Sequence, residues 1–134
     1  MALYVIFESP LQVLADNPVH YLEQADAMSF LAAVPTTWDE TRALDAHAGD
    51  YVLLARRSGA EWYVGAIADG TARALELDLS FLPEGPHRMQ IWRDGVNADR
   101  YGNDYVMEER TVTRADRLCV ELAAGGGWAA RIWQ

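Results

Sequence analysis

The sequence predicts a mainly β protein, an antiparallel β-sandwich of about eight strands in a Greek-key-like order with one or two N-terminal helices. Three observations support this class. From residue 35 onward, apolar residues recur mostly with a period of two, which is typical of strands. The runs are short and turn sequences separate them, such as the triple glycine at 125–127. A hairpin within residues 49–70 is apolar on both faces, so we expect it inside a sheet.

The first expected element is a helix over residues 2–16. Its apolar side chains recur mostly at spacings of three and four, the period of one helix face. They are Leu3, Tyr4, Ile6, Phe7, Leu11 and Leu14. Pro10 either kinks this helix or starts a second one with Ser9 as its N-cap, and Asn17-Pro18 is expected to end it. A further helix is expected over about residues 21–33.

The strands are expected to follow as a series of short runs. We place them at residues 37–43, 51–58, 62–69, 72–79, 87–94, 104–111, 117–122 and 128–133. In the central hairpin, Gly59 supplies the positive φ that its loop needs. Because both faces of this hairpin are apolar, we expect a second sheet on one face and another covering element on the other.

Composition limits the partners of this chain. Its 134 residues are enough for one domain with its own core, and the net charge of −9 argues against nucleic acid, which needs clustered basic residues. Cys119 is the single cysteine, so we expect no intrachain disulfide. The apolar run at residues 2–7 is far shorter than the roughly 20 residues of a membrane span, and it lacks the flanks of a signal peptide. We therefore expect no membrane partner.

One loop is a weak candidate for a metal site. Asp94, Asn97 and Asp99 place three oxygen-bearing side chains beside a glycine. However, Val96 and Ala98 stand where an EF-type calcium loop needs oxygen ligands, so no metal site is predicted. The alternative is a hairpin connection with Asx-type turns.

Three tryptophans are candidates for sugar contact. Strand alternation turns Trp62 and Trp128 toward the core and leaves Trp38, Trp92 and Trp133 to stack on sugar rings. The alternative for these three is burial in the core or in an interface.

No catalytic residue is predicted. Asp39 and Glu40 are the residue types of a glycosidase, but neighbours on a strand point to opposite faces and cannot flank one glycosidic bond. His20, His47 and His87 are scattered, without the spacing of metal ligands.

Long stretches of the chain carry a family resemblance. They are PTTWDETRALDAHAGDYVLLARRSGAEWYVGAIADGTAR at residues 35–73, IWRDGVNAD at 91–99, the strand at 104–111 and AAGGGWAARI at 123–132. Together they resemble the C-terminal domain of glycoside hydrolase family 97, a family of α-glucosidases and α-galactosidases. LYVIFESPLQVLADNP at residues 3–18 resembles the last helix of that family's catalytic (β/α)8 barrel.

The resemblance implies a helical segment at residues 1–34, from the end of the barrel, and a β-sandwich domain at 35–134. It also implies a non-catalytic accessory domain, because the family's catalytic carboxylates and calcium lie upstream of these stretches. No cofactor is therefore expected in this chain, and Met1 is expected to mark the start of a fragment. The family is typically periplasmic or secreted in bacteria.

The implied partners are the catalytic barrel and further copies of the same chain. The first expected helix is apolar over most of its circumference, more than one sandwich edge can bury. Its six apolar residues are the expected interface: Leu3, Tyr4, Ile6, Phe7, Leu11 and Leu14. The alternative function is a carbohydrate-binding module that uses exposed tryptophans.

Overall fold

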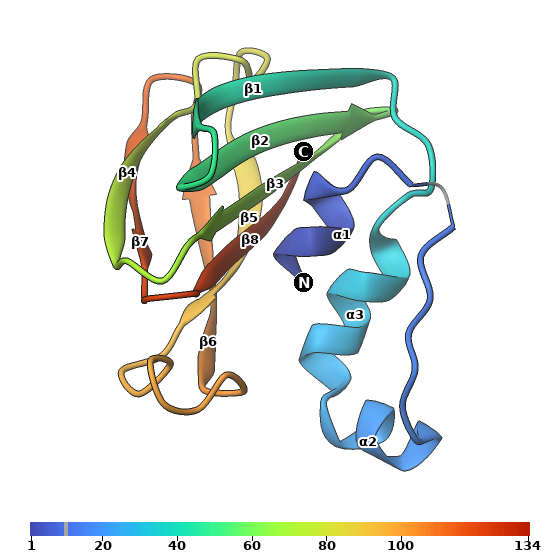
Figure 1. The fold of residues 1–134 in the computed structure, drawn as a ribbon. Helices are drawn as coiled ribbons and strands as arrows, with labels where there is room; N and C mark the ends of the chain where they lie inside the picture. Colours follow the sequence, from blue (N-terminus) through green and yellow to red (C-terminus); the bar gives the residue numbers. More distant parts are fainter. Residues whose placement is uncertain (10) are drawn as a thin grey trace.

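Eight antiparallel strands form two sheets in the computed structural model, which describes residues 1–9 and 11–134 (Figure 1). The larger sheet contains, in spatial order, β1 (Glu40–His47), β2 (Tyr51–Ser58), β3 (Glu61–Ala68), β8 (Gly127–Trp133), β5 (His87–Asp94) and β6 (Tyr105–Val112). The smaller sheet pairs β4 (Arg73–Asp78) with β7 (Arg117–Leu122). The predicted antiparallel β-sandwich is confirmed.

The β2–β3 hairpin lies inside the larger sheet, as expected. Its strands pair from Tyr51 opposite Ala68 to Ser58 opposite Glu61, and Gly59 in the loop has a φ of 59°. β1 pairs with the outer side of β2, and β8 pairs with the outer side of β3. Both faces of the hairpin are covered, which explains why both are apolar.

The main core lies between the two sheets. Trp62 and Trp128 both face it, as the alternation predicts, and the Trp62 ring lies 4.7 Å from that of Phe81. Leu75 and Leu77 of β4 and Val120 of β7 close this core from the opposite side. Burial of these side chains is the main force that holds the sandwich together.

Three short helices lie on the side of the other face of the larger sheet, and the first and third of them cover it (Figure 1). They are α1 (Ala2–Ile6), α2 (Pro18–Glu23) and α3 (Ala25–Ala33). A second apolar cluster fills the space beneath them: Val5, Phe30, Tyr63, Trp92 and Ala129. The Phe30 ring centroid lies 4.8 Å from that of Trp92, so α3 is held to β5 by aromatic contact.

α1 lies directly against β3 because Gly65 has no side chain. A Cβ at this position would come within 2.9 Å of the Val5 Cβ and 3.0 Å of the Ala2 carbonyl oxygen. Such distances are shorter than van der Waals contact, so any larger residue would push α1 off the sheet.

The helix prediction is wrong in three places. α1 ends at Ile6, and residues 7–9 and 11–17 contain no helix, so the predicted helix over 2–16 is far too long. Asn17-Pro18 does not end a helix but begins α2: the Asn17 side chain accepts from the Val19 N–H at 3.0 Å and Pro18 occupies the first turn. The expected helix over 21–33 is divided at Gln24, whose φ of −113° interrupts it. The expectation for Pro10 lies outside the described residues.

The strand predictions agree more closely, with one displacement. β1 covers Glu40–His47 where residues 37–43 were expected, and its pairing with β2 shifts register between Ala43 and Asp45. Such a bulge breaks the alternation that a sequence pattern relies on. In the described part of the chain, none of the helices is sufficiently long and apolar to cross a membrane.

Candidate interaction surface

Exposed apolar side chains gather in the N-terminal part of the chain. Eleven large apolar side chains are exposed among the described residues, and seven of them precede residue 23. These seven define the N-terminal apolar surface: Leu3, Phe7, Leu11, Val13, Leu14, Val19 and Leu22. Since water disfavours extended apolar surface, a concentration of this kind is a candidate interaction surface.

The structure places the six expected interface residues in two settings. Leu3, Phe7, Leu11 and Leu14 are exposed, with Leu11 at 79%, whereas Tyr4 and Ile6 are half-buried. The six therefore do not form one helical stripe, because α1 ends at Ile6 and the rest of the segment is not helical.

A hollow of about 640 Å³ lies between this segment and the helices α2 and α3. Tyr4 and Leu14 line it together with Met28 and Leu31 of α3. The structure thus brings two of the expected interface residues to one concave place, which Asp16 and Glu23 also line.

The buried side chain of Arg56 joins the N-terminal segment to the sheet. Its guanidinium group donates to the Phe7 carbonyl oxygen at 3.0 Å and to the Ile6 carbonyl oxygen at 3.3 Å, and it pairs with the Glu8 carboxylate. It also lies 5.6 Å from the centre of the Trp38 ring. A cation at the C-terminal end of α1 satisfies carbonyl groups that have no partner within the helix.

A second network holds α3 to the centre of the sheet. Arg131 donates to both oxygens of Glu61 at 2.8 Å, and this contact lowers the pKa of Glu61 below its ordinary value. The Tyr63 hydroxyl lies 2.7 Å from Glu61 and 2.8 Å from the Ala33 carbonyl oxygen at the end of α3. Burial raises the pKa of Tyr63, so its hydroxyl stays a donor.

The other end of α3 is fixed to β6. The Tyr105 hydroxyl donates to the Asp26 carboxylate at 2.7 Å. Burial, together with this carboxylate, raises the pKa of Tyr105 to about 12. The helical layer is therefore held at both ends by polar contacts as well as by the apolar cluster.

Each of the three candidate tryptophans is packed against other groups of the same chain. Trp92 is 2% exposed and lies under Phe30, so of the two alternatives weighed for it the structure shows burial in a core. Trp38 is half-buried, with Arg56 over its ring and Tyr63 at 5.5 Å. The larger sheet is covered on both faces, so side chains on either face enter a core. Trp62 points into the main core between the sheets, and Trp92 points into the cluster beneath the helices.

The ring of Trp133 is occupied as well. The guanidinium groups of Arg88 and Arg131 lie 5.3 and 5.1 Å from its centroid. Both contacts are cation–π interactions with groups of the same chain. Because groups of the same chain pack on their rings, these tryptophans do not support a carbohydrate-binding platform.

In the candidate metal loop at residues 94–99, the polar groups stabilise turns and strand ends. The Asp94 carboxylate accepts from the backbone N–H groups of Ala123 at 2.8 Å and Gly127 at 3.2 Å. Asn97 uses its backbone N–H to bind Asp104 at 2.7 Å, and Asp99 pairs with Arg100 at 3.8 Å. Across residues 1–9 and 11–134, no three His, Cys, Asp or Glu side chains are grouped as metal ligands.

The carboxylates beside Trp38 are also engaged in structure. Asp39 accepts from the Gly59 backbone N–H at 2.7 Å, which ties the start of β1 to the hairpin loop. Glu40 pairs with Arg42 at 2.6 Å and with Arg57 at 3.3 Å. The Arg42 contact lowers the pKa of Glu40.

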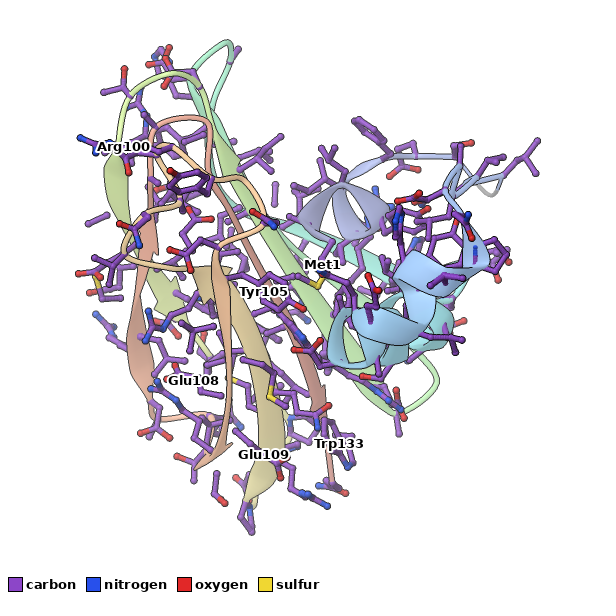
Figure 2. The ribbon with its side chains drawn as sticks, turned by 90° about the horizontal axis from the view of Figure 1, so that it is seen from below. Met1, Arg100, Tyr105, Glu108, Glu109 and Trp133 are labelled. Carbon is purple, nitrogen blue, oxygen red and sulfur yellow. The ribbon has the colours of Figure 1, made fainter. Side chains whose placement is uncertain are left out.

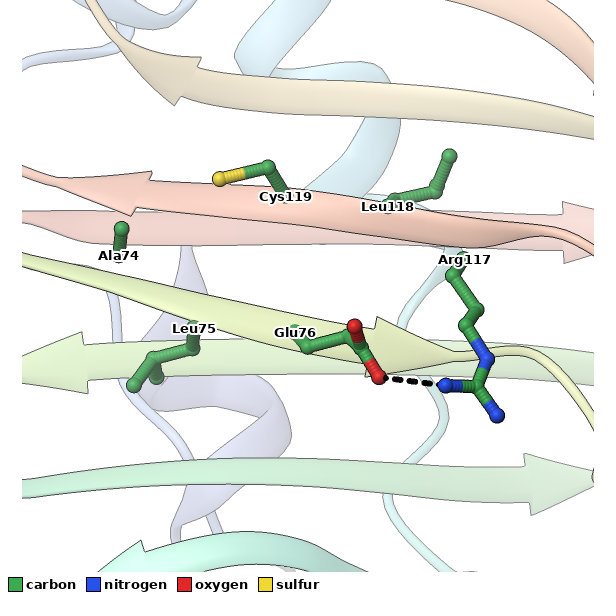
Figure 3. Close-up of a pocket in the computed structure, with 6 residues that line it drawn as sticks. All are labelled: Ala74, Leu75, Glu76, Arg117, Leu118 and Cys119. Atoms are coloured by element: carbon green, nitrogen blue, oxygen red, sulfur yellow. Dashed lines mark hydrogen bonds and ion pairs between the residues drawn. The ribbon is translucent and has the colours of Figure 1, made fainter.

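A shallow depression of about 290 Å³ lies on the outer face of the smaller sheet (Figure 3). The ion pair between Glu76 and Arg117, 3.1 Å long, crosses it, and the exposed Cys119 lies beside it. Both members of this pair are about two-thirds exposed, so it contributes little to stability.

The sequence reasoning missed Arg56, the residue that holds the N-terminal segment. The only sequence signal for this role is the arginine itself, which stands on a face of β2 that is otherwise apolar and packs against α1. Alternation places Arg56 on the same face as Val52 and Leu54, and a charge there needs a buried partner.

The fold and this surface define a β-sandwich domain with a concentration of exposed apolar groups at its N-terminal segment. The family model described as "Glycosyl-hydrolase 97 C-terminal, oligomerisation" matches residues 37–133. The chain therefore belongs to the C-terminal domain family of glycoside hydrolase family 97, and the resemblance seen in its sequence is confirmed.

Relatives support this assignment at the level of sequence. The retaining alpha-galactosidase of Bacteroides thetaiotaomicron is 45% identical over 132 residues, which are 98% of this chain and 20% of the relative. A probable retaining alpha-galactosidase of Streptomyces bingchenggensis is 35% identical over 130 residues, 97% of this chain and 19% of the relative. The chain thus spans about one fifth of the length of these relatives.

A solved structure has the same fold. A glycoside hydrolase family 97 enzyme from Pseudoalteromonas sp. strain K8, in complex with acarbose, superposes with a TM-score of 0.91 at 41% identity. The match covers 98% of this chain and 22% of that enzyme.

Proposed function

We propose that this chain is the non-catalytic accessory domain of a longer family 97 glycoside hydrolase, that it packs on the catalytic barrel, and that it supports self-association. The N-terminal apolar surface carries this proposal. Seven exposed apolar side chains within 22 residues are more than a stable free surface tolerates, and a neighbouring domain of the same enzyme would cover them.

The segment from residue 1 to 34 is proposed to be the connection between barrel and sandwich. α1 rests on Gly65 and is held by Arg56, so its position on the sheet is fixed. A fixed helix at this place would set the orientation of any protein that precedes it.

The longer enzyme is proposed to act on α-galactosides. Two relatives, one of them 45% identical, are named as retaining or probable retaining α-galactosidases. The reading frame upstream of Met1 is expected to continue into a catalytic barrel, and a stop codon directly upstream would contradict the proposal.

Paired variants of the longer enzyme test the packing. Leu11→Ser with Leu14→Ser is expected to lower the Tm of the enzyme by several degrees, because apolar contacts with the barrel are lost. Val96→Ser is the control, since Val96 is 97% exposed and lies far along the chain from this surface. Equal Tm values for the double variant and the control would contradict packing through the N-terminal apolar surface.

Activity provides the second arm of the test. The 134-residue chain alone is expected to release no product from aryl α-galactosides or α-glucosides, whereas the longer enzyme cleaves an α-galactoside. Hydrolysis by the isolated chain would overturn its role as an accessory domain.

A further inference from the structure

β6 is an open edge of the larger sheet. It pairs with β5 along its whole length, from Tyr105 opposite Asp94 to Val112 opposite His87, with no shift of register. Within the described residues its other side has no strand partner. Natural edges are normally blunted by bulges, prolines or charged side chains; β6 contains no bulge or proline, and its charges are of both signs, Glu108, Glu109 and Arg110. Exposed Val106 and Met107 make this edge a candidate for pairing.

The charges on β6 are complementary to a second copy of β6. Consider an antiparallel pair of β6 strands related by a two-fold axis at Glu109. Residues directly opposite each other then point to the same face. The opposed pairs are Val106 with Val112, Met107 with Thr111, Glu108 with Arg110, and Glu109 with its own equivalent.

In this register each Glu108 faces an arginine and each Arg110 faces a glutamate of the other copy. The same two residues already pair within one chain, with Arg110 Nη2 2.6 Å from Glu108 Oε1. Both lie on the face toward the smaller sheet, where Glu108 also approaches Arg93 at 3.8 Å. Cross-strand contact would thus extend an existing ion pair into a network of both copies.

The axis brings two Glu109 side chains together on the opposite face, where Figure 2 labels Glu109 near Trp133. Each is neutralised within its own chain, because Arg88 donates to Glu109 through Nε at 3.0 Å and through a second nitrogen, and Gln90 donates at 3.2 Å. The Arg88 contact lowers the pKa of Glu109. The repulsion at the axis is therefore reduced.

We infer that β6 pairs with β6 of a second copy of this chain, in the register with Glu108 opposite Arg110, and joins two larger sheets into one continuous sheet. This inference rests on the proposed self-association and names the surface that carries it. It leaves the N-terminal apolar surface free for the catalytic barrel.

Charge-reversal variants test the register. Sedimentation velocity over a concentration series measures the dimer Kd of the 134-residue chain. Glu108→Arg alone and Arg110→Glu alone each place like charges opposite one another twice in the dimer, so each is expected to raise the Kd at least tenfold. In an equimolar mixture, each arginine of one variant faces a glutamate of the other, and a heterodimer is expected to form with nearly the original Kd.

Matched controls separate this effect from loss of net charge or of folding. Glu76→Arg and Arg117→Glu make the same charge changes in the ion pair on the outer face of the smaller sheet (Figure 3), and they are expected to leave the Kd unchanged. Circular dichroism melting of each variant confirms that it remains folded at the temperature of measurement.

Other results would contradict either the β6 register or self-association itself. A wild-type dimer that both β6 variants leave intact, or variants whose mixture does not recover, would overturn the β6 register while self-association through another surface stands. A wild-type chain that stays monomeric at every concentration would overturn self-association itself and show that the β6 charges keep the edge unpaired. The packing on the barrel is tested independently by the Leu11 and Leu14 variants.

Discussion

Arg56 binds the C-terminal end of α1 and fixes it to the sheet. Its guanidinium group binds the last carbonyl groups of α1 and the Glu8 carboxylate while it is itself 1% exposed. The chain leaves the helix at Phe7, whose ψ of 137° is that of an extended residue. A tertiary contact 50 residues away along the chain therefore stabilises the end of α1.

Replacement of this residue tests that role. Arg56→Met is expected to lower the free energy of unfolding by about 2 kcal/mol, because two carbonyl groups and the Trp38 ring lose their partner. Arg57→Met is the matched control, since the neighbouring Arg57 is one-third exposed and makes surface pairs worth less than about 1 kcal/mol. Urea unfolding of both variants measures the difference, and equal losses would contradict the anchoring role.

Glu61 gives the stability of the molecule a dependence on pH. Its folded-state pKa is lowered by Arg131, so its contribution is complete above its unfolded pKa of about 4.3 and is lost as the pH falls through the folded value. Glu61→Gln is therefore expected to make the decline of stability below pH 5 less steep. Melting curves from pH 3 to pH 7 measure this, with Glu76→Gln on the outer face as a control. An unchanged slope would show that the Glu61–Arg131 contact does not contribute.

At the scale of elements, the strands were predictable and the helix ends were not. The ranges expected for β2, β5 and β7 agree with the structure, because alternation and turn residues are local signals. The apolar residues from Leu3 to Leu14 are spaced like one face of a helix. In the structure they belong to a segment whose apolar side chains are largely exposed to solvent. Spacing alone cannot distinguish a buried helical face from an exposed interface segment.

The candidate site could be predicted only in part. The N-terminal position of the apolar surface follows from its residues, whereas its shape depends on where α1 ends. The burial of Trp92 was not predictable from alternation, because both faces of the larger sheet are covered near β5 and either direction leads into a core. The edge position of β6 depends on strand order, which the sequence pattern does not contain.

The contact between α1 and β3 depends on a single glycine. Gly65→Ala is expected to lower the free energy of unfolding by about 1–3 kcal/mol, because the new methyl group meets Val5 and the Ala2 carbonyl. Binding of a hydrophobic dye should rise at the same time as α1 moves away. Gly70→Ala provides the control, since nothing lies within 4 Å of the added atom. Equal stability of the two variants would mean that α1 does not rest on Gly65.

At the scale of the whole molecule, two surfaces lie on different parts of the sandwich. The N-terminal apolar surface belongs to the helical layer, and β6 forms one edge of the larger sheet (Figure 1). In the proposed assembly, the first surface holds the catalytic barrel and the second joins two enzymes. The two contacts are therefore separable by mutation.

Hydrogen–deuterium exchange tests the central proposal most directly. The backbone amides of residues 3–9 and 11–14 are compared in the isolated 134-residue chain and in the longer enzyme, with the loop around Val96 as an internal reference. We expect exchange at residues 11–14 to slow at least tenfold in the longer enzyme, because the barrel covers them. Equal exchange in the two proteins would contradict the role of this chain as a domain that docks on the barrel.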